Sequence, residues 1–151
     1  MRPTLAAVAA MALIAAACRA PAAAPAPLPA GDAAGNGGPL VTTLQTDAAA
    51  DSVRFTLQVT NATQQPVTLG FSSGQSYDFT VSDGSSVVWR WSQDMMFTQA
   101  LRSEMLAPGQ TRSWSETWRP AASLRGRTLT ATARLTSTTH PVERAQTFRL
   151  P

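Results

Sequence analysis

The sequence predicts an all-β domain, a sandwich or a barrel, over residues 40–151. Beyond Leu40, apolar and polar residues alternate with a period of two, as in strands that bury one face. Thr, Val and aromatic residues, which favour strands, are frequent there. Turn sequences separate the alternating runs at "NATQQP" (61–66), "DGS" (83–85), "APGQ" (107–110) and "THP" (139–141). Short strands punctuated about every 8–12 residues are typical of sandwiches and barrels.

Residues 1–17 have the pattern of a signal peptide. Arg2 gives a positive start, and the apolar run Leu5–Ala17 is too short for a comfortable transmembrane helix. The run ends in "AAAC", and small residues before a cysteine resemble the lipobox of bacterial lipoproteins, in which the cysteine is lipidated after cleavage. We therefore expect Cys18 to be a lipidation site, although Ala15 stands where leucine is usual. Ordinary cleavage after "AAA", with Cys18 left free, is the alternative.

Cys18 is the only cysteine, so no intrachain disulfide can form and the domain depends on its core. A Cys-rich metal site is excluded, and a lipidated Cys18 cannot be a nucleophile. Residues 18–39 are dominated by Ala, Pro and Gly, which predicts a disordered linker with extended and flexible parts. The expected location is the bacterial cell envelope, where the exported chain is anchored to a membrane by lipid.

Three runs show the alternation most clearly. We expect their apolar residues to face the core: Val53, Phe55, Leu57 and Val59; Val67, Leu69 and Phe71; Leu129, Ala131, Ala133 and Leu135. Elsewhere, only "AASLRG" (121–126) has the character of a helical turn. A domain of this size buries enough surface to fold without disulfides.

Six of the ten aromatic residues lie between Phe71 and Gln99. Within this stretch, "YDFTV" and "VVWRW" read as paired strands. A pairing of Val81 with Val87 places the large side chains on one face, with Phe79 opposite Trp89 and Tyr77 opposite Trp91. Asp78 then lies opposite Arg90, and Thr80 opposite Val88, on the other face. We interpret the aromatic face as core.

The residues that follow Trp91 differ from a core strand, because three large apolar residues stand together just after a strand end. Such residues are either tucked beneath the loop or offered to a partner. We expect them to be tucked. The segment is nevertheless the first candidate for a partner-binding loop: Ser92, Gln93, Asp94, Met95, Met96, Phe97, Thr98 and Gln99. The second candidate is the loop Thr138–Arg144.

A further strand, "TRSWSETW", places Trp114 and Trp118 on the same face as Arg112 and Glu116. If this face points inward, Glu116 is at least partly buried and needs a cationic or hydrogen-bonding partner. A structural ion pair is the simplest role for it.

Several of these strings, taken together, resemble the BsuPI-type intracellular proteinase inhibitor domain. The similarity covers about residues 53–135 and rests on uncommon residue combinations in the family's order: "FSSGQ" (71–75), "YDF" (77–79), "VWRWS" (88–92), "MFTQ" (96–99), "LAPG" (106–109) and Trp118. The resemblance implies an immunoglobulin-like antiparallel β-sandwich and, by the family name, inhibition of a serine protease. It supplies no reactive-site residues. The named inhibitor is intracellular, whereas this chain carries an export signal.

Composition argues against several functions. The formal charge is +3, and removal of residues 1–17 leaves 11 arginines against nine acidic residues, which is too weak a charge for nucleic-acid binding. His140 is the single histidine and reads as a solvated loop residue, and carboxylates are scattered. We therefore expect no enzyme activity, no catalytic residues, no metal and no cofactor.

Two functions remain open. The first is a membrane-tethered, proteinase-inhibitor-like binding domain whose partner is a serine protease or another envelope protein. The second is a structural or adhesive immunoglobulin-like module of the cell envelope without a protease partner. Exposure of Met95, Met96 and Phe97 would favour the first, and their burial the second.

Anchoring yields a prediction. We expect Cys18→Ser to leave an unlipidated protein that no longer partitions with membranes, because the acceptor sulfur is gone. Detergent phase separation of both proteins would measure this. A Cys18→Ser protein that still enters the detergent phase completely would refute the lipid anchor.

Overall fold

The computed structural model describes residues 38–151, which form an antiparallel β-sandwich, so the predicted fold class is confirmed. The expected signal peptide, Cys18 and nearly all of the expected linker lie outside the described residues. The strands are β1 (Leu40–Ala48), β2 (Val53–Asn61), β3 (Val67–Phe71), β4 (Tyr77–Asp83), β5 (Ser86–Arg90), β6 (Arg102–Leu106), β7 (Thr111–Trp118), β8 (Thr128–Leu135) and β9 (Val142–Arg149). Two short 3₁₀ helices are η1 (Trp91–Asp94) and η2 (Ala122–Leu124), the second within the expected helical turn.

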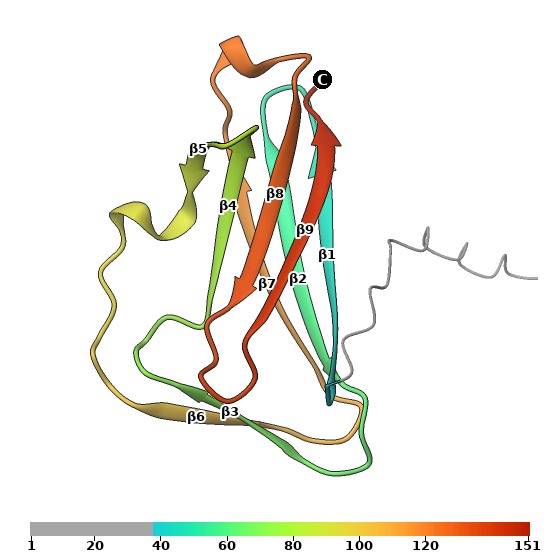
Figure 1. Ribbon diagram of the computed structural model, residues 1–151, viewed down its shortest axis with the longest axis vertical. Coiled ribbons are helices and arrows are strands. Elements are labelled where there is room, and N and C mark those ends of the chain that lie inside the picture. The colour runs from blue at the N-terminus through green and yellow to red at the C-terminus, as the bar shows by residue number, and fades with distance from the viewer. Residues whose placement is uncertain (1–37) are drawn as a thin grey trace, which may run out of the picture.

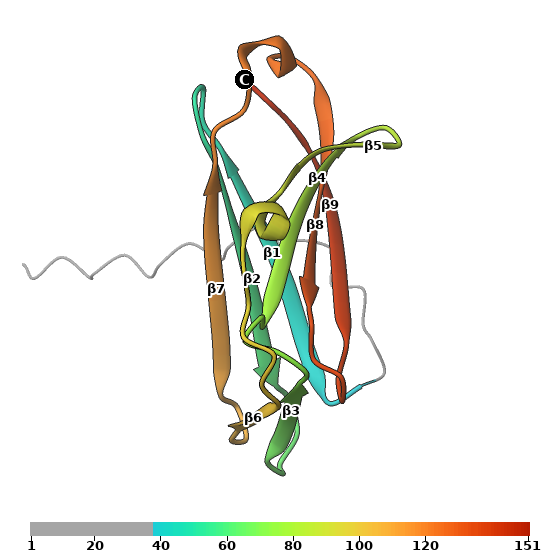
Figure 2. The same ribbon diagram turned by 90° about the vertical axis from the view of Figure 1, so that its left-hand side faces the viewer.

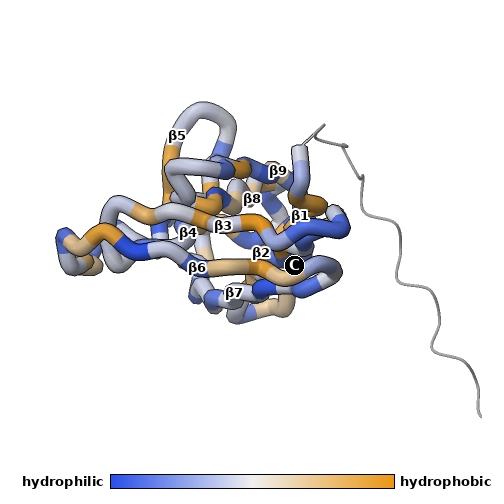
Figure 3. The backbone as a smooth tube through the Cα atoms, turned by 90° about the horizontal axis from the view of Figure 1, so that it is seen from below, coloured by the Kyte–Doolittle hydropathy of each residue, from blue (hydrophilic) through white to orange (hydrophobic). Residues whose placement is uncertain are grey.

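The strands form two facing layers (Figures 1 and 2). One sheet has the order β1-β2-β7 and the other the order β5-β4-β8-β9. A two-stranded sheet of β3 and β6 closes the lower end, as the view from below shows (Figure 3). On one side of the sandwich, β1 and β9 are joined by a hydrogen bond from Arg144 Nε to the Thr42 carbonyl oxygen (3.2 Å). We call the other side, where β7 and β5 are the outer strands, the open edge.

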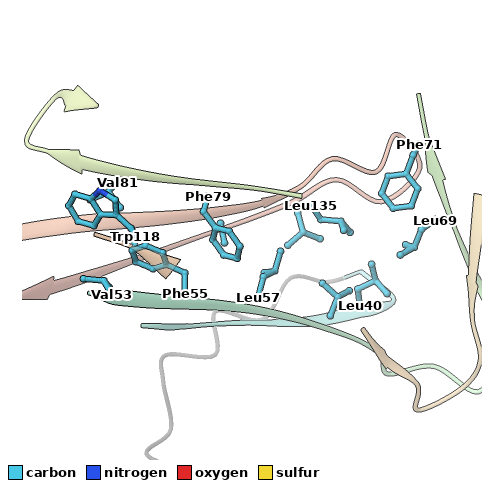
Figure 4. Close-up of a cluster of buried hydrophobic side chains, with 14 of the residues drawn as sticks. Leu40, Val53, Phe55, Leu57, Leu69, Phe71, Phe79, Val81, Trp118 and Leu135 are labelled. Atoms are coloured by element: carbon cyan, nitrogen blue, oxygen red, sulfur yellow. The ribbon is translucent and has the colours of Figure 1, made fainter. Parts of the chain in front are cut away.

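The alternating runs bury the residues that the period of two predicts. Side chains from the two layers point toward each other in the core, and Leu69 and Phe71 of β3 cover the end that lies at the right in Figure 4. Phe55 lies at the centre, where its ring stacks against Phe79 (5.9 Å between centroids) and Trp89 (5.7 Å). The inward positions predicted for β2, β3 and β8 are all buried.

The register predicted for β4 and β5 is wrong. Val81, not Phe79, lies opposite Trp89, and Thr80, not Asp78, lies opposite Arg90. The pairing is displaced by two residues, so the large side chains keep their common face although their partners change. The expected contact between the rings of Tyr77 and Trp91 does occur, but Trp91 reaches it from η1 and not from a paired strand.

A tight turn and a β-bulge explain the displacement. Asp83 pairs with Ser86 around a two-residue turn in which Gly84 has a φ of 58°, a conformation that glycine adopts without steric cost. An irregularity between Val81 and Ser82 then adds one residue on the β5 side. As a result, Val87 is exposed instead of opposing Val81, and Val88 packs against the core.

Asn61, at the end of β2, is a fully buried polar residue with every side-chain group bonded. Its amide donates to the carbonyl oxygens of Gln65 (2.7 Å) and Leu106 (2.9 Å), and its side-chain oxygen accepts from the backbone and hydroxyl of Thr63. Its backbone also bonds to the turn before β7 through Gly109. One side chain thus connects β2, the turn before β3, and β6.

Loss of this side chain should destabilise the domain. Asn61→Ala leaves buried carbonyl groups without a donor, which costs at least about 1–3 kcal/mol of unfolding free energy. Gln58→Ala, an exposed position on the same strand, should change it by less than about 0.5 kcal/mol. Urea denaturation of both variants measures the difference, and equal midpoints would contradict the role assigned to Asn61.

Candidate binding loop at the open edge

The first candidate loop, Ser92–Gln99, runs along the open edge of the sandwich. It includes most of η1, and the residues that follow have no regular secondary structure down to β6. Figure 1 shows this connection at the left of the molecule, and Figure 2 shows it in front of the space between β7 and β4. The loop therefore links β5 of one sheet to β6 across the side of the sandwich.

Asp78 holds the start of the loop. Its carboxylate accepts a hydrogen bond from the Ser92 backbone N–H (3.2 Å) and another from the Ser92 hydroxyl (2.6 Å). Asp78 lies on β4, directly before the buried Phe79. A carboxylate that was predicted to oppose Arg90 instead fixes the first turn of the loop.

The end of the loop is held by the backbone of the turn that follows β3. The Gly74 N–H donates to the Thr98 carbonyl oxygen at 2.8 Å. A Cβ atom at position 74 would lie 2.8 Å from the Thr98 hydroxyl, so a larger residue here would force the Thr98 side chain to move. The two ends of the loop are thus fixed at Ser92 and Thr98.

Arg102 braces the same turn from β6. Its guanidinium donates to the carbonyl oxygens of Ser73 (3.0 Å) and Gly74 (3.3 Å) and to the Ser76 hydroxyl (2.5 Å). It also forms an ion pair with Glu104 (2.6 Å) and lies 4.1 Å from the centre of the Phe71 ring. Because the guanidinium is planar with several donors, one side chain can hold several acceptors of a turn in place.

A row of aromatic rings runs from Phe97 in the loop inward to the two sheets. The Phe97 ring lies 5.7 Å from Trp91, Trp91 stacks on Tyr77 at 4.4 Å, and Tyr77 lies 5.8 Å from Trp114 on the opposite sheet. Tyr77 in turn contacts Phe79 in the core (5.6 Å). The row therefore extends from the loop across the open edge to both sheets.

The two methionines of the loop are exposed, so the prediction that they are tucked is wrong. Met96 is 99% exposed and Met95 47%. Phe97 alone is half-buried, because its ring rests against Trp91. The loop is fixed at both ends and Phe97 is turned inward, which leaves the methionine side chains at the surface.

Glu116 of β7 is half-buried as predicted, but its partner is a phenol and not a cation. The Tyr77 hydroxyl donates to its carboxylate at 2.5 Å, which joins the two sheets at the open edge. Burial raises the pKa of Tyr77 above its ordinary value, and the hydrogen bond to Glu116 and the charge of that carboxylate raise it further.

The second candidate loop, Thr138–Arg144, is tied to β3. The Thr138 N–H donates to the Gly70 carbonyl oxygen (2.8 Å), and the Thr139 hydroxyl donates to that of Thr68 (2.9 Å). His140 is half-buried beside a cavity of about 200 Å³ that this loop forms with residues 38–40. The loop offers no large exposed apolar side chain, so its geometry fits a partner less well than that of the first loop.

Among residues 38–151, no group of three or more His, Cys, Asp or Glu side chains could hold a metal ion. The same residues contain no helix that is long and apolar enough to cross a membrane.

The sequence named the loop as a candidate but did not point to the residues that position it. Asp78, Gly74 and Arg102 act through contacts with segments 14 to 29 residues away in the chain. The one local signal was the glycine of "SSGQ", since a glycine beside a strand end often marks a close backbone approach.

The described residues thus form an antiparallel β-sandwich with a braced, exposed loop at its open edge. The chain belongs to the BsuPI family, described as intracellular proteinase inhibitor, whose profile matches residues 40–140. The family resemblance in the sequence is thereby confirmed.

Two solved structures are similar in part. Spo0M, a sporulation control protein from Bacillus subtilis, aligns with a TM-score of 0.42 and 12% identity, covering 74% of this chain and 47% of Spo0M. A β-glucosidase from Kluyveromyces marxianus aligns with a TM-score of 0.35 and 12% identity, covering 73% of this chain and 14% of the glucosidase. This chain thus spans less than half the length of either protein. No curated protein sequence matches it.

Tyr77 provides a pH-dependent prediction. Its raised pKa means that above about pH 10 the folded state holds a proton that the unfolded state has lost, so stability should fall as pH rises past that value. Because the chain has one tyrosine, phenolate absorbance reports on Tyr77 alone. It should appear near pH 10 in the denatured chain and at higher pH in the folded one.

Glu116→Gln should lower the pKa of Tyr77 in the folded protein, since it removes the carboxylate charge. Glu143→Gln, on the exposed face of β9, is the matched control and should leave the titration unchanged. A folded Glu116→Gln protein that titrates at the same pH as the folded parent would show that the Tyr77–Glu116 contact does not form.

Proposed function

We propose that this protein is a membrane-tethered, proteinase-inhibitor-like binding domain of the bacterial cell envelope. In this proposal Cys18 carries the lipid, residues 18–39 are the spacer, and the domain from residue 40 binds a serine protease. The contact with the protease is made by the loop Ser92–Gln99. The domain itself performs no catalysis and needs no cofactor.

The exposed pair Met95–Met96, between two fixed loop ends, is the observation that carries the proposal. Binding orders flexible side chains and loops at an entropic cost, and a loop already held in shape avoids much of that cost. Here Asp78 fixes one end and Gly74 the other, while the ring of Phe97 is anchored from within. Unbranched methionine side chains then present an adaptable apolar surface to a partner.

Family membership supports the choice of a protease as partner. The profile of the proteinase inhibitor family includes the loop and both of its anchors. Inhibitors that bind by a protruding, braced loop fit the cleft of a protease, which accepts a chain that is narrow and exposed. The rings of Trp91, Tyr77 and Trp114 are half-buried against one another, so they are less accessible to such a cleft than the exposed methionines.

The test is inhibition of a panel of serine proteases by the detergent-solubilised full-length protein. Met95→Ser with Met96→Ser should weaken inhibition by about 30-fold or more if these residues are an interface hot spot. Thermal melting should be unchanged, because both side chains are exposed. Met105→Ser is the matched control, since Met105 is an exposed methionine on β6.

Phe55→Ala separates loss of binding from loss of fold. Removing this buried ring should cost about 3–5 kcal/mol of stability, and any loss of inhibition should then follow the loss of folded protein. If the double methionine variant inhibits as well as the parent, the loop assignment is wrong. If the parent inhibits no protease, the structural or adhesive envelope module becomes the better description.

A further inference from the structure

We infer that Met96 is the side chain that enters the primary specificity pocket of the protease, so that the partner is a protease with a deep, uncharged, apolar pocket. This inference rests on the proposed function and names the residue and the class of partner. It predicts that the loop binds as a substrate does, with one side chain read by one pocket.

Exposure singles out Met96. It is 99% exposed, whereas Met95 before it is 47% exposed and Phe97 after it is half-buried against Trp91. The backbone at Met95 is extended, with φ −101° and ψ 144°. A protease binds the residue before the scissile bond with its side chain in the specificity pocket. Met96, which directly follows the extended backbone of Met95, is the most exposed apolar side chain available for that position.

Other exposed apolar residues lack this setting. Leu101 is 88% exposed, but it lies beyond Thr98, outside the interval held at both ends. Met105 is 65% exposed, but it is within β6 and its backbone is paired with Thr68 of β3. Met105 is thus part of a paired strand and not of a loop that projects from the sandwich.

The charge of the loop defines the class of protease. Between Trp91 and Leu101 the only ionisable residue is Asp94, and there is no arginine or lysine. A pocket that carries a carboxylate to bind a basic side chain would find no counter-charge here and would face Asp94 instead. An apolar slot, as in chymotrypsin-like specificity, accepts an unbranched thioether side chain.

The experiment introduces a positive charge at Met96 and, as controls, at Met95 and Met105. Full-length Met96→Arg, Met95→Arg and Met105→Arg proteins are assayed against chymotrypsin and subtilisin, which have apolar pockets, and against trypsin, which has an acidic one. Met96→Arg should lose about 30-fold or more of its inhibition of the apolar-pocket enzymes and gain inhibition of trypsin. Met96→Leu should retain the parent's preference. Met95→Arg and Met105→Arg should have smaller effects and no gain against trypsin.

The outcomes separate this inference from the proposed function. If the parent inhibits no serine protease of any specificity, both fail. If it inhibits trypsin, or another protease without an apolar pocket, and none of the apolar-pocket enzymes, only the inference fails. If it inhibits chymotrypsin or subtilisin but Met96→Arg inhibits equally well, the loop or the domain binds in another way and only the inference fails. A greater loss for Met95→Arg than for Met96→Arg would overturn the assignment of the residue. Thermal melting of each variant confirms that the fold is retained.

Discussion

The phenol of Tyr77 is the contact on which the open edge of this sandwich depends. One ring meets Phe79 in the core, Trp91 at the start of the loop and Trp114 on the facing sheet, while its hydroxyl bonds to Glu116. A sandwich edge without such a bridge would expose the apolar interior between its layers. Because the bridge is aromatic and its polar end is satisfied, the edge can be closed by side chains alone and still offer a flat support for a loop.

Because the loop is supported in this way, neighbouring residues in and beside it can have different roles. Trp91 and Phe97 stabilise, since their rings extend the core outward, whereas Met95 and Met96 are more exposed and, in the proposed function, make the contact with the partner. The polar anchors at Asp78 and Gly74 hold the backbone between them in one shape. Rigid elements beneath a loop position its side chains more accurately than the loop could alone. In this way the aromatic-rich stretch is both core and scaffold.

The fold could be predicted because its signal is local. The alternation that buries Val53, Phe55 and Leu57 is written in adjacent residues, and it needs no knowledge of which strands pair. The register of β4 and β5 could not be predicted in this way, because the turn around Gly84 and one bulged residue, Val88, together displace the pairs by two residues. The exposure of Met96 likewise depends on anchors that lie elsewhere in the chain. Its apolar character alone predicted burial.

The position of the loop in the strand order has a consequence for chain connectivity. A peptide bond broken within the loop would divide the domain into one piece that carries β1–β5 and another that carries β6–β9. Each of the three sheets contains strands from both pieces: β7 lies beside β2, β6 beside β3, and β4 is between β5 and β8. Exposed loops are where such nicks occur. The two fragments would therefore remain interlaced as a non-covalent complex, because neither piece could leave without stripping strands from every sheet.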